Sequence, residues 1–152
     1  MKGLTKSPLE TKRLGENFAR KIIKNNNKYR KAIVICLEGD LGGGKTTFVQ
    51  GFAKGLGIKE KILSPTFIIM RKFRIFPTKR DKSFFRYLYH IDCYRLNSSK
   101  DINGLDFEDI ISDPRNIVIV EWAGRVKKIL SSCNVFIKFH FVNAKTRKIV
   151  VK

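Results

Sequence analysis

The stretch Gly39-Asp40-Leu41-Gly42-Gly43-Gly44-Lys45-Thr46 decides the fold. It matches the pattern of a glycine, four residues and then Gly-Lys-Ser/Thr, in which a loop cradles phosphate groups at the start of a helix. Glycine amides can wrap phosphate oxygens only where no Cβ intrudes, and the helix N-terminus adds a favourable dipole. By chance, the four fixed positions coincide in on the order of one chain in a hundred of this length. The stretch therefore predicts a binding site for ATP.

The flanking segments are those that such a loop requires. Ala32 to Leu37 is a continuous apolar run rich in Ile and Val, typical of a strand buried on both faces. Lys45 to Leu56 follows the loop as a predicted helix. Earlier in the chain, Ser7-Pro8-Leu9-Glu10 is a helix-start signal, and apolar residues at helical spacing from Leu14 to Ile23 extend that helix toward Asn25.

The rest of the chain alternates short strands with two short helices. We predict strands over Thr66–Phe73, Phe84–Ile91, Ile117–Val120, Val135–Val142 and Lys148–Val151, and helices over Asp101–Ile111 and Ala123–Leu130. A turn over Pro77–Lys82 predicts an antiparallel hairpin. We therefore expect an α/β fold. It is a single P-loop NTPase-like domain over residues 1–152, with a mixed, mostly parallel central sheet flanked by helices and an appended antiparallel hairpin.

Composition excludes several classes of protein. An apolar content of 43% with 12 Phe argues against a disordered chain. No stretch of about 18 apolar residues occurs, so we expect no membrane association and a cytoplasmic protein. Lys and Arg number 32 against 13 acidic residues, and a net charge of +19 would attract polyanions. Equally, a lysine-rich proteome would produce the same charge, since Asn, Ile, Lys and Phe are abundant together.

The three cysteines, Cys36, Cys93 and Cys133, are an odd number without short paired spacing. This pattern indicates neither a disulfide framework nor a zinc site. We expect buried, reduced thiols that act as small apolar side chains.

Candidate residues for the chemistry follow from the loop. Lys45 would supply a mobile positive charge to the β- and γ-phosphates, and Thr46 an oxygen to Mg²⁺. Two apolar runs end in an acid, namely Asp92 and Glu121, as expected of carboxylates that hold magnesium at the end of a neighbouring strand. Glu121 is the stronger magnesium candidate, whereas Asp92 would be a second metal-shell acid or would orient the attacking water. The pattern alone would allow the reverse order, and either acid could simply cap a strand or pair with an arginine.

Four ordered motifs resemble those of the TsaE family, the ATPases of bacterial tRNA threonylcarbamoyladenosine synthesis. They are Gly39–Thr47, Ser64-Pro-Thr-Phe67, His90-Ile-Asp-Cys-Tyr-Arg95 and Val120-Glu-Trp122. The likeness extends to Thr11–Gly15 and Gly104–Asp109, so it spans nearly the whole chain. Gly43 is a departure, since the family usually has Ala there.

The resemblance implies a small P-loop ATPase that binds ATP and Mg²⁺, is weakly active alone and works with TsaB and TsaD homologues. By motif, phosphate would be bound by Lys45, Thr47 and the loop residues Gly39, Asp40, Leu41, Gly42, Gly43 and Gly44. Thr46 and Glu121 would hold magnesium, Asp92 would support hydrolysis and contact the metal, and Thr66 would sense the γ-phosphate. Thr11 and Lys145 are our candidates for the adenine base.

Several alternatives remain at this stage. A small P-loop kinase would share the loop, with the basic, Phe-rich stretch Arg71–Arg86 as its lid. An RNA-binding module with a vestigial nucleotide site would explain the charge, and a transient tRNA contact is compatible with the ATPase as well. His90 and Trp122 are more simply explained as packed structural residues than as catalytic ones.

Overall fold

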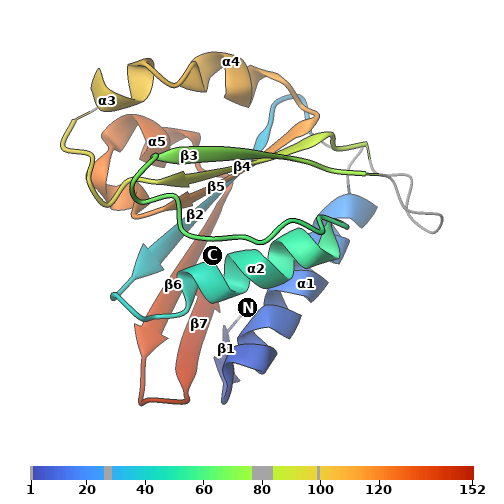
Figure 1. Ribbon diagram of the computed structural model, residues 1–152, viewed down its shortest axis with the longest axis vertical. Coiled ribbons are helices and arrows are strands. Elements are labelled where there is room, and N and C mark those ends of the chain that lie inside the picture. Colours follow the sequence, from blue (N-terminus) through green and yellow to red (C-terminus); the bar gives the residue numbers. More distant parts are fainter. Residues whose placement is uncertain (1, 26–28, 77–83, 99) are drawn as a thin grey trace.

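The computed structural model describes residues 2–25, 29–76, 84–98 and 100–152 (Figure 1). Within these residues, seven strands form one sheet in the order β1-β7-β6-β2-β5-β4-β3. The strands are β1 (Lys2–Thr5), β2 (Ile33–Gly39), β3 (Met70–Arg74), β4 (Tyr87–Asp92), β5 (Asn116–Glu121), β6 (Val135–Phe141) and β7 (Arg147–Val151). This confirms the α/β class and the mixed sheet.

The balance of strand directions differs from the prediction. The central pairs β2–β5, β2–β6 and β4–β5 are parallel, but β1–β7, β6–β7 and β3–β4 are antiparallel. A mostly parallel sheet is therefore wrong for the described strands, because antiparallel pairs extend both edges of a parallel centre. The antiparallel pairing of β3 with β4 agrees with the expected hairpin, whose predicted turn at residues 77–82 lies outside the described residues.

Helices lie on both faces of the sheet (Figure 1). On one face α1 (Pro8–Lys24) and α2 (Lys45–Gly55) lie side by side, and their apolar residues share a core with Ile33, Ile35 and Leu37 of β2. The other face is covered by α3 (Lys100–Asn103), α4 (Phe107–Ser112), the 3₁₀ helix η2 (Ala123–Arg125) and α5 (Lys127–Ser132). The alternate residues Val34 and Cys36 pack there, as the two-residue period of a strand requires.

The start of α1 follows the sequence signal closely. The Ser7 side chain accepts a hydrogen bond from the backbone N–H of Glu10 at 3.1 Å, and Glu10 Oε2 accepts one from the Lys6 N–H at 2.7 Å. Pro8 occupies the first turn, where no amide is needed, and the helix ends at Lys24. The predicted helix is confirmed.

Four predicted elements differ in their bounds, because two strands begin later than expected and two helices are divided. The strand predicted from Phe84 begins only at Tyr87. Thr66–Ile69 forms a turn, so the strand that follows begins only at Met70. The helix predicted over Asp101–Ile111 is divided into α3 and α4 by a turn in which Asp106 has a φ of 51°. The helix predicted over Ala123–Leu130 is divided into η2 and α5, because Val126 has extended backbone angles.

The cysteines also differ from expectation. Cys36, on β2, and Cys133, directly after α5, are joined by a disulfide with Cα atoms 6.0 Å apart. They are 97 residues apart in the chain, and only the packing of α5 against this face of the sheet brings them together. Free thiols were therefore a wrong prediction for this pair, whereas Cys93 is a free, buried thiol as expected. Burial is the main cause that raises the pKa of Cys93 to about 12.

The contact between α1 and α2 depends on glycine. A Cβ placed on Gly51 would lie 1.9 Å from the Lys12 carbonyl oxygen of α1, a distance that no real contact allows. We expect Gly51→Ala to lower the free energy of unfolding by about 1–3 kcal/mol, because the helices must move apart. Urea unfolding followed by circular dichroism would measure this. Gly3→Ala is the matched control, since no atom lies within 4 Å of its added Cβ, and equal stability of the two variants would contradict the packing argument.

Candidate nucleotide-binding site

The glycine-rich loop connects the end of β2 to the start of α2, in the middle of the sheet. Gly39 has a φ of 135° and its Cβ position is only 2.1 Å from the Phe139 carbonyl oxygen, so a side chain is excluded there. Gly44 has a φ of 95° and directly precedes α2, which presents its N-terminus to the loop. The strand, loop and helix are thus arranged as the motif predicts.

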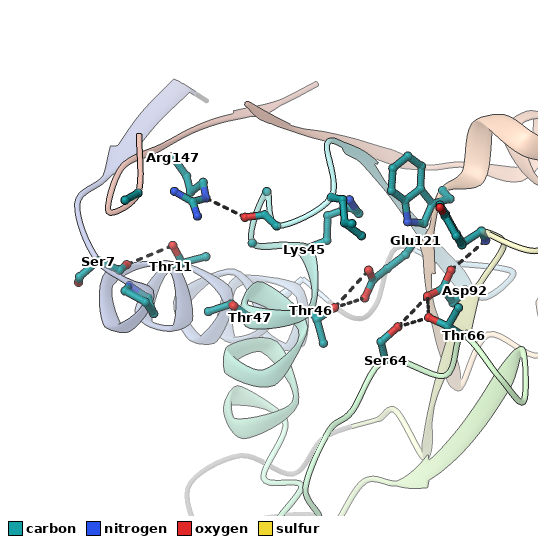
Figure 2. A pocket seen from close by; sticks show the side chains of 18 of the residues that line it. Ser7, Thr11, Lys45, Thr46, Thr47, Ser64, Thr66, Asp92, Glu121 and Arg147 are labelled. Carbon is teal, nitrogen blue, oxygen red and sulfur yellow. Dashed lines mark hydrogen bonds between the residues drawn. The ribbon is translucent and has the colours of Figure 1, made fainter. Parts of the chain in front are cut away.

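A pocket of about 450 Å³ opens beside this loop, within the size range of small-molecule sites (Figure 2). Its walls come from segments far apart in the chain, and the loop residues Leu41 to Thr47 form its floor. The other lining residues are Ser7, Pro8, Thr11, Ser64, Thr66, Asp92, Tyr94, Glu121, Trp122, Ala144, Lys145 and Arg147.

Lys45 is the first residue of α2, its side chain reaches back to the loop, and the residue is 5% exposed. Its Nζ donates to the carbonyl oxygens of Gly39 at 2.7 Å and of Asp40 at 2.9 Å. Gly39 and Asp40 do not line the pocket, but both contact this lysine, and the Asp40 carbonyl oxygen also accepts the N–H of the pocket residue Gly43 at 3.0 Å. Burial lowers the pKa of Lys45, although Glu121 and three other carboxylates oppose that shift.

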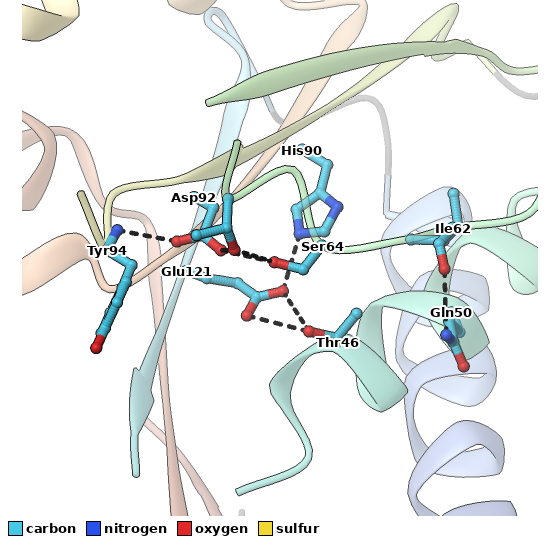
Figure 3. A network of polar contacts seen from close by, with 9 residues as sticks. Thr46, Gln50, Ile62, Ser64, His90, Asp92, Tyr94 and Glu121 are labelled. Carbon is cyan, nitrogen blue, oxygen red and sulfur yellow. Dashed lines mark hydrogen bonds and ion pairs between the residues drawn. The ribbon is translucent and has the colours of Figure 1, made fainter. Parts of the chain in front are cut away.

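Glu121 joins the loop to the sheet (Figure 3). The Thr46 hydroxyl donates to its two carboxylate oxygens at 3.1 and 3.3 Å. On the other side, His90 Nε2 lies 2.9 Å from Glu121 Oε1 in a fully buried contact. Because a carboxylate accepts hydrogen bonds, we assign Nε2 of His90 as the donor in this contact. The structure therefore gives His90 a contact with a candidate metal ligand, which the sequence pattern did not indicate.

Asp92 forms a second network next to the first (Figure 3). Its Oδ2 accepts hydrogen bonds from the hydroxyls of Ser64 and Thr66, each at 2.7 Å, and its Oδ1 accepts the Tyr94 N–H at 2.9 Å. Asp92 and Glu121 are paired in the parallel register of β4 and β5, so both carboxylates point from the same face of the sheet. The structure therefore brings both predicted acids and Thr66 together at the loop.

The two residues proposed for the base line the opposite part of the pocket. Thr11 is buried on α1, where its hydroxyl lies 2.8 Å from that of Thr5, and Lys145 lies in the exposed turn between β6 and β7. Arg147 was missed by the sequence reasoning. Its Nε donates to the Gly42 carbonyl oxygen at 3.1 Å, which ties β7 to the glycine-rich loop. No motif surrounds Arg147, so only the fold reveals it.

Trp122 follows Glu121 with a φ of 59° and is partly buried. Lys45 Nζ lies 4.1 Å from its ring centroid, and the Tyr94 ring is 5.3 Å away. The indole therefore packs over the catalytic lysine candidate, in line with the packing role expected for it. A cation over an indole face is itself a favourable contact.

These residues fit ATP with Mg²⁺. The loop has glycine where a Cβ would obstruct its fold, a lysine within it, and a helix N-terminus behind it. The Thr46 hydroxyl contacts the two carboxylate oxygens of Glu121. Hydroxyl and carboxylate oxygens are the ligands that Mg²⁺ prefers. The pocket is large enough for a nucleotide, and the basic residues Lys145 and Arg147 are among those that line it.

The part of the chain that the structure describes contains no helix long and apolar enough to cross a membrane.

Comparison with known proteins identifies the family. The family described as Threonylcarbamoyl adenosine biosynthesis protein TsaE matches residues 5–149. The tRNA threonylcarbamoyladenosine biosynthesis protein TsaE of Treponema pallidum is 31% identical over 151 residues, covering 99% of each chain. The protein of the same name from Haemophilus influenzae is 28% identical over 129 residues, covering 85% of this chain and 75% of that one. A crystal structure of Bacillus subtilis YdiB matches 98% of this chain and 82% of its own, with a TM-score of 0.68 and 28% identity. The chain therefore belongs to the TsaE family of tRNA threonylcarbamoyladenosine biosynthesis proteins.

Proposed function

We propose that this chain is an ATP-binding and ATP-hydrolysing accessory protein of tRNA threonylcarbamoyladenosine modification, and that it acts in the cytoplasm with TsaB and TsaD homologues. The proposal rests on one observation: Thr46, Glu121 and Asp92 lie close together at one end of the phosphate-binding loop. A binding module would need the loop alone. Two buried carboxylates beside it support the proposal that the bound phosphate is also hydrolysed.

Each residue of the site has a separate role in this proposal. Lys45 and the amides of the loop from Leu41 to Gly44 would hold the phosphates, and Thr47 would support them from the first turn of α2. Thr46 and Glu121 would hold magnesium, with Asp92 near it, and the ion would neutralise charge on the phosphate oxygens. His90 would keep the Glu121 carboxylate oriented toward Thr46. Thr11 and Lys145 would contact the base.

Asp92 has a specific place in this scheme. Both of its oxygens accept hydrogen bonds in the present structure, and Ser64 and Thr66 share Oδ2. If the Thr66 hydroxyl turned toward a γ-phosphate, Oδ2 would gain a free lone pair. Asp92 would then be able to accept a proton of the attacking water and orient its oxygen.

The test is ATP turnover with and without purified TsaB and TsaD homologues. We expect slow hydrolysis by the chain alone and at least a tenfold higher rate with both partners, because the partner complex would complete or reset the site. Free phosphate is the expected product, so phosphate release is the measurement. Phosphorylation of an added acceptor by labelled ATP would instead indicate a kinase. RNA binding that is steeply salt dependent and indifferent to ATP would favour an RNA-binding module over the ATPase, since phosphate contacts release counterions.

We further propose a transient contact to tRNA during this cycle. A net charge of +19 supports such a contact, but it does not select tRNA over any other polyanion.

A further inference from the structure

The segment between α2 and β3 presents large apolar side chains to solvent beside the nucleotide pocket. Phe67 is 83% exposed, Ile68 60% and Leu63 50%. Single exposed apolar residues are ordinary, but three within six residues form a patch of the kind found at interaction sites. We name the set of Leu63, Phe67, Ile68, Arg95 and Arg125 the Phe67 surface.

This surface is attached directly to the catalytic network. Thr66, next to Phe67 in the chain, donates to Asp92, and so does Ser64, next to Leu63. The backbone adds a further connection, because the Asp92 N–H donates to the Ile69 carbonyl oxygen at 2.8 Å. A displacement of Phe67 would therefore alter the hydrogen bonds that this segment makes with Asp92.

The turn that carries the patch is held in a costly conformation. Ile69 has a φ of 65°, which is rare for a β-branched side chain. Its N–H donates to the Pro65 carbonyl oxygen at 2.6 Å, and the Ile68 N–H donates to the same oxygen at 3.0 Å. Strained backbone of this kind is typical of functional segments and is retained because its surroundings impose it. Here it keeps Phe67 and Ile68 turned outward.

Two arginines are associated with the patch, Arg95 by contact with Phe67 and Arg125 by contact with Tyr94, the residue before Arg95. The guanidinium of Arg95 lies 4.4 Å from the Phe67 ring centroid, and that of Arg125 lies 5.4 Å from the Tyr94 ring centroid. Both arginines are exposed, and neither forms an ion pair with another described residue. Their donors are free to meet carboxylates of another molecule.

We propose that the Phe67 surface is the docking site for a partner protein that presents an apolar pocket rimmed by carboxylates, and that docking there acts on hydrolysis through Thr66 and Asp92. This rests on the proposed function, in which that partner is the TsaB and TsaD pair. Aromatic and arginine side chains are enriched at the energetic centres of protein interfaces. The aliphatic Leu63 and Ile68 offer nothing to a base or a phosphate, which argues against RNA. A second copy of this chain is disfavoured, since each copy carries a net charge of +19.

The experiment uses the full-length double variant Phe67→Ser/Ile68→Ser, with Leu4→Ser as the matched control. Leu4 is an apolar residue as exposed as Ile68, at 61%, on the opposite edge strand β1. We expect the double variant to keep the wild-type ATPase rate in the absence of partners, within twofold. Its affinity for the TsaB and TsaD complex, measured by titration calorimetry, should fall at least tenfold, and the stimulation of turnover should be lost. Leu4→Ser should behave like wild type in all three measurements.

A second variant covers the case in which serine at position 67 disturbs Thr66 and lowers the basal rate. Arg95→Glu/Arg125→Glu reverses the charge of the rim and leaves the sequence of the turn itself intact, and it should weaken the same complex at least tenfold. Retention of wild-type affinity and stimulation by both double variants would overturn the docking site while leaving the proposed function intact. Loss of RNA binding or of self-association in these variants, with partner stimulation retained, would also overturn it. A wild-type chain that neither binds nor responds to TsaB and TsaD would overturn the proposed function and this assignment together.

Discussion

Replacing Lys45 by alanine is expected to abolish ATP binding at micromolar concentrations and to reduce turnover at least a hundredfold. The ammonium bonds two backbone carbonyl oxygens of the loop, those of Gly39 and Asp40, and is buried beside them. In the proposed complex it exchanges these bonds for charge-assisted bonds to phosphate. Each such bond contributes about 1.5–3 kcal/mol, so the loss of two corresponds to a factor of a hundred or more.

The measurements are ATP affinity by calorimetry and phosphate release at saturating ATP. Lys54→Ala is the matched control, because Lys54 lies on the same helix but its side chain is 74% exposed and pairs with Glu16. Thermal unfolding of both variants separates a loss of binding from a loss of fold. Wild-type affinity in Lys45→Ala would refute the loop as the phosphate site.

The second large effect is expected at the two acids. Glu121→Gln should raise the magnesium concentration needed for half-maximal turnover, because the amide is a weaker ligand than the carboxylate. Asp92→Asn should lower turnover at saturating magnesium by about a hundred- to a thousandfold, the usual cost of removing one preorganised group that acts in the transition state. ATP affinity of Asp92→Asn should stay within a few fold of wild type, since Asp92 is not proposed to hold the nucleotide.

Magnesium titrations of turnover, with calorimetric ATP binding alongside, distinguish the two roles. Glu108→Gln is a suitable control, because this carboxylate is 63% exposed and pairs with Lys128 on the far side of the sheet. The reverse result, with the magnesium requirement raised by Asp92→Asn and the saturated rate lowered by Glu121→Gln, would exchange the assignments. Wild-type turnover in both variants would refute the hydrolytic mechanism.

The sequence predicted the centre of the molecule better than its edges. β2 and β5 are continuous apolar runs because both of their faces are buried, and such runs are visible without a structure. The edge strand β1 was not predicted, since its four residues pair only with β7 and carry no apolar run. The run Phe67-Ile68-Ile69, by contrast, was wrongly predicted to belong to a strand because it is apolar. It forms an exposed turn, and hydrophobicity alone does not distinguish a buried residue from one exposed for another purpose.

In the candidate site too, some residues could be predicted from the sequence and others only from the fold. Lys45, Thr46, Asp92 and Glu121 were found because each stands at a fixed place in a motif or at the end of an apolar run. The contact between His90 and Glu121 and the position of Arg147 were not found, because both depend on how strands distant in sequence align. The disulfide between Cys36 and Cys133 escaped prediction for the same reason. Contacts across a sheet are set by register, which a single sequence does not display.

The register of the parallel strands has a consequence for how this protein can change over evolutionary time. Leu37, Glu121 and Asp92 are aligned across β2, β5 and β4. The number of residues that precede each acid in its strand therefore decides whether that acid faces the loop. A substitution such as Ile to Val inside these strands leaves that count unchanged. Inserting or deleting one residue in β4 or β5 would turn the acid to the opposite face, toward α4 and α5. Drift in this lineage should therefore preserve the lengths of these strands far more strictly than their composition.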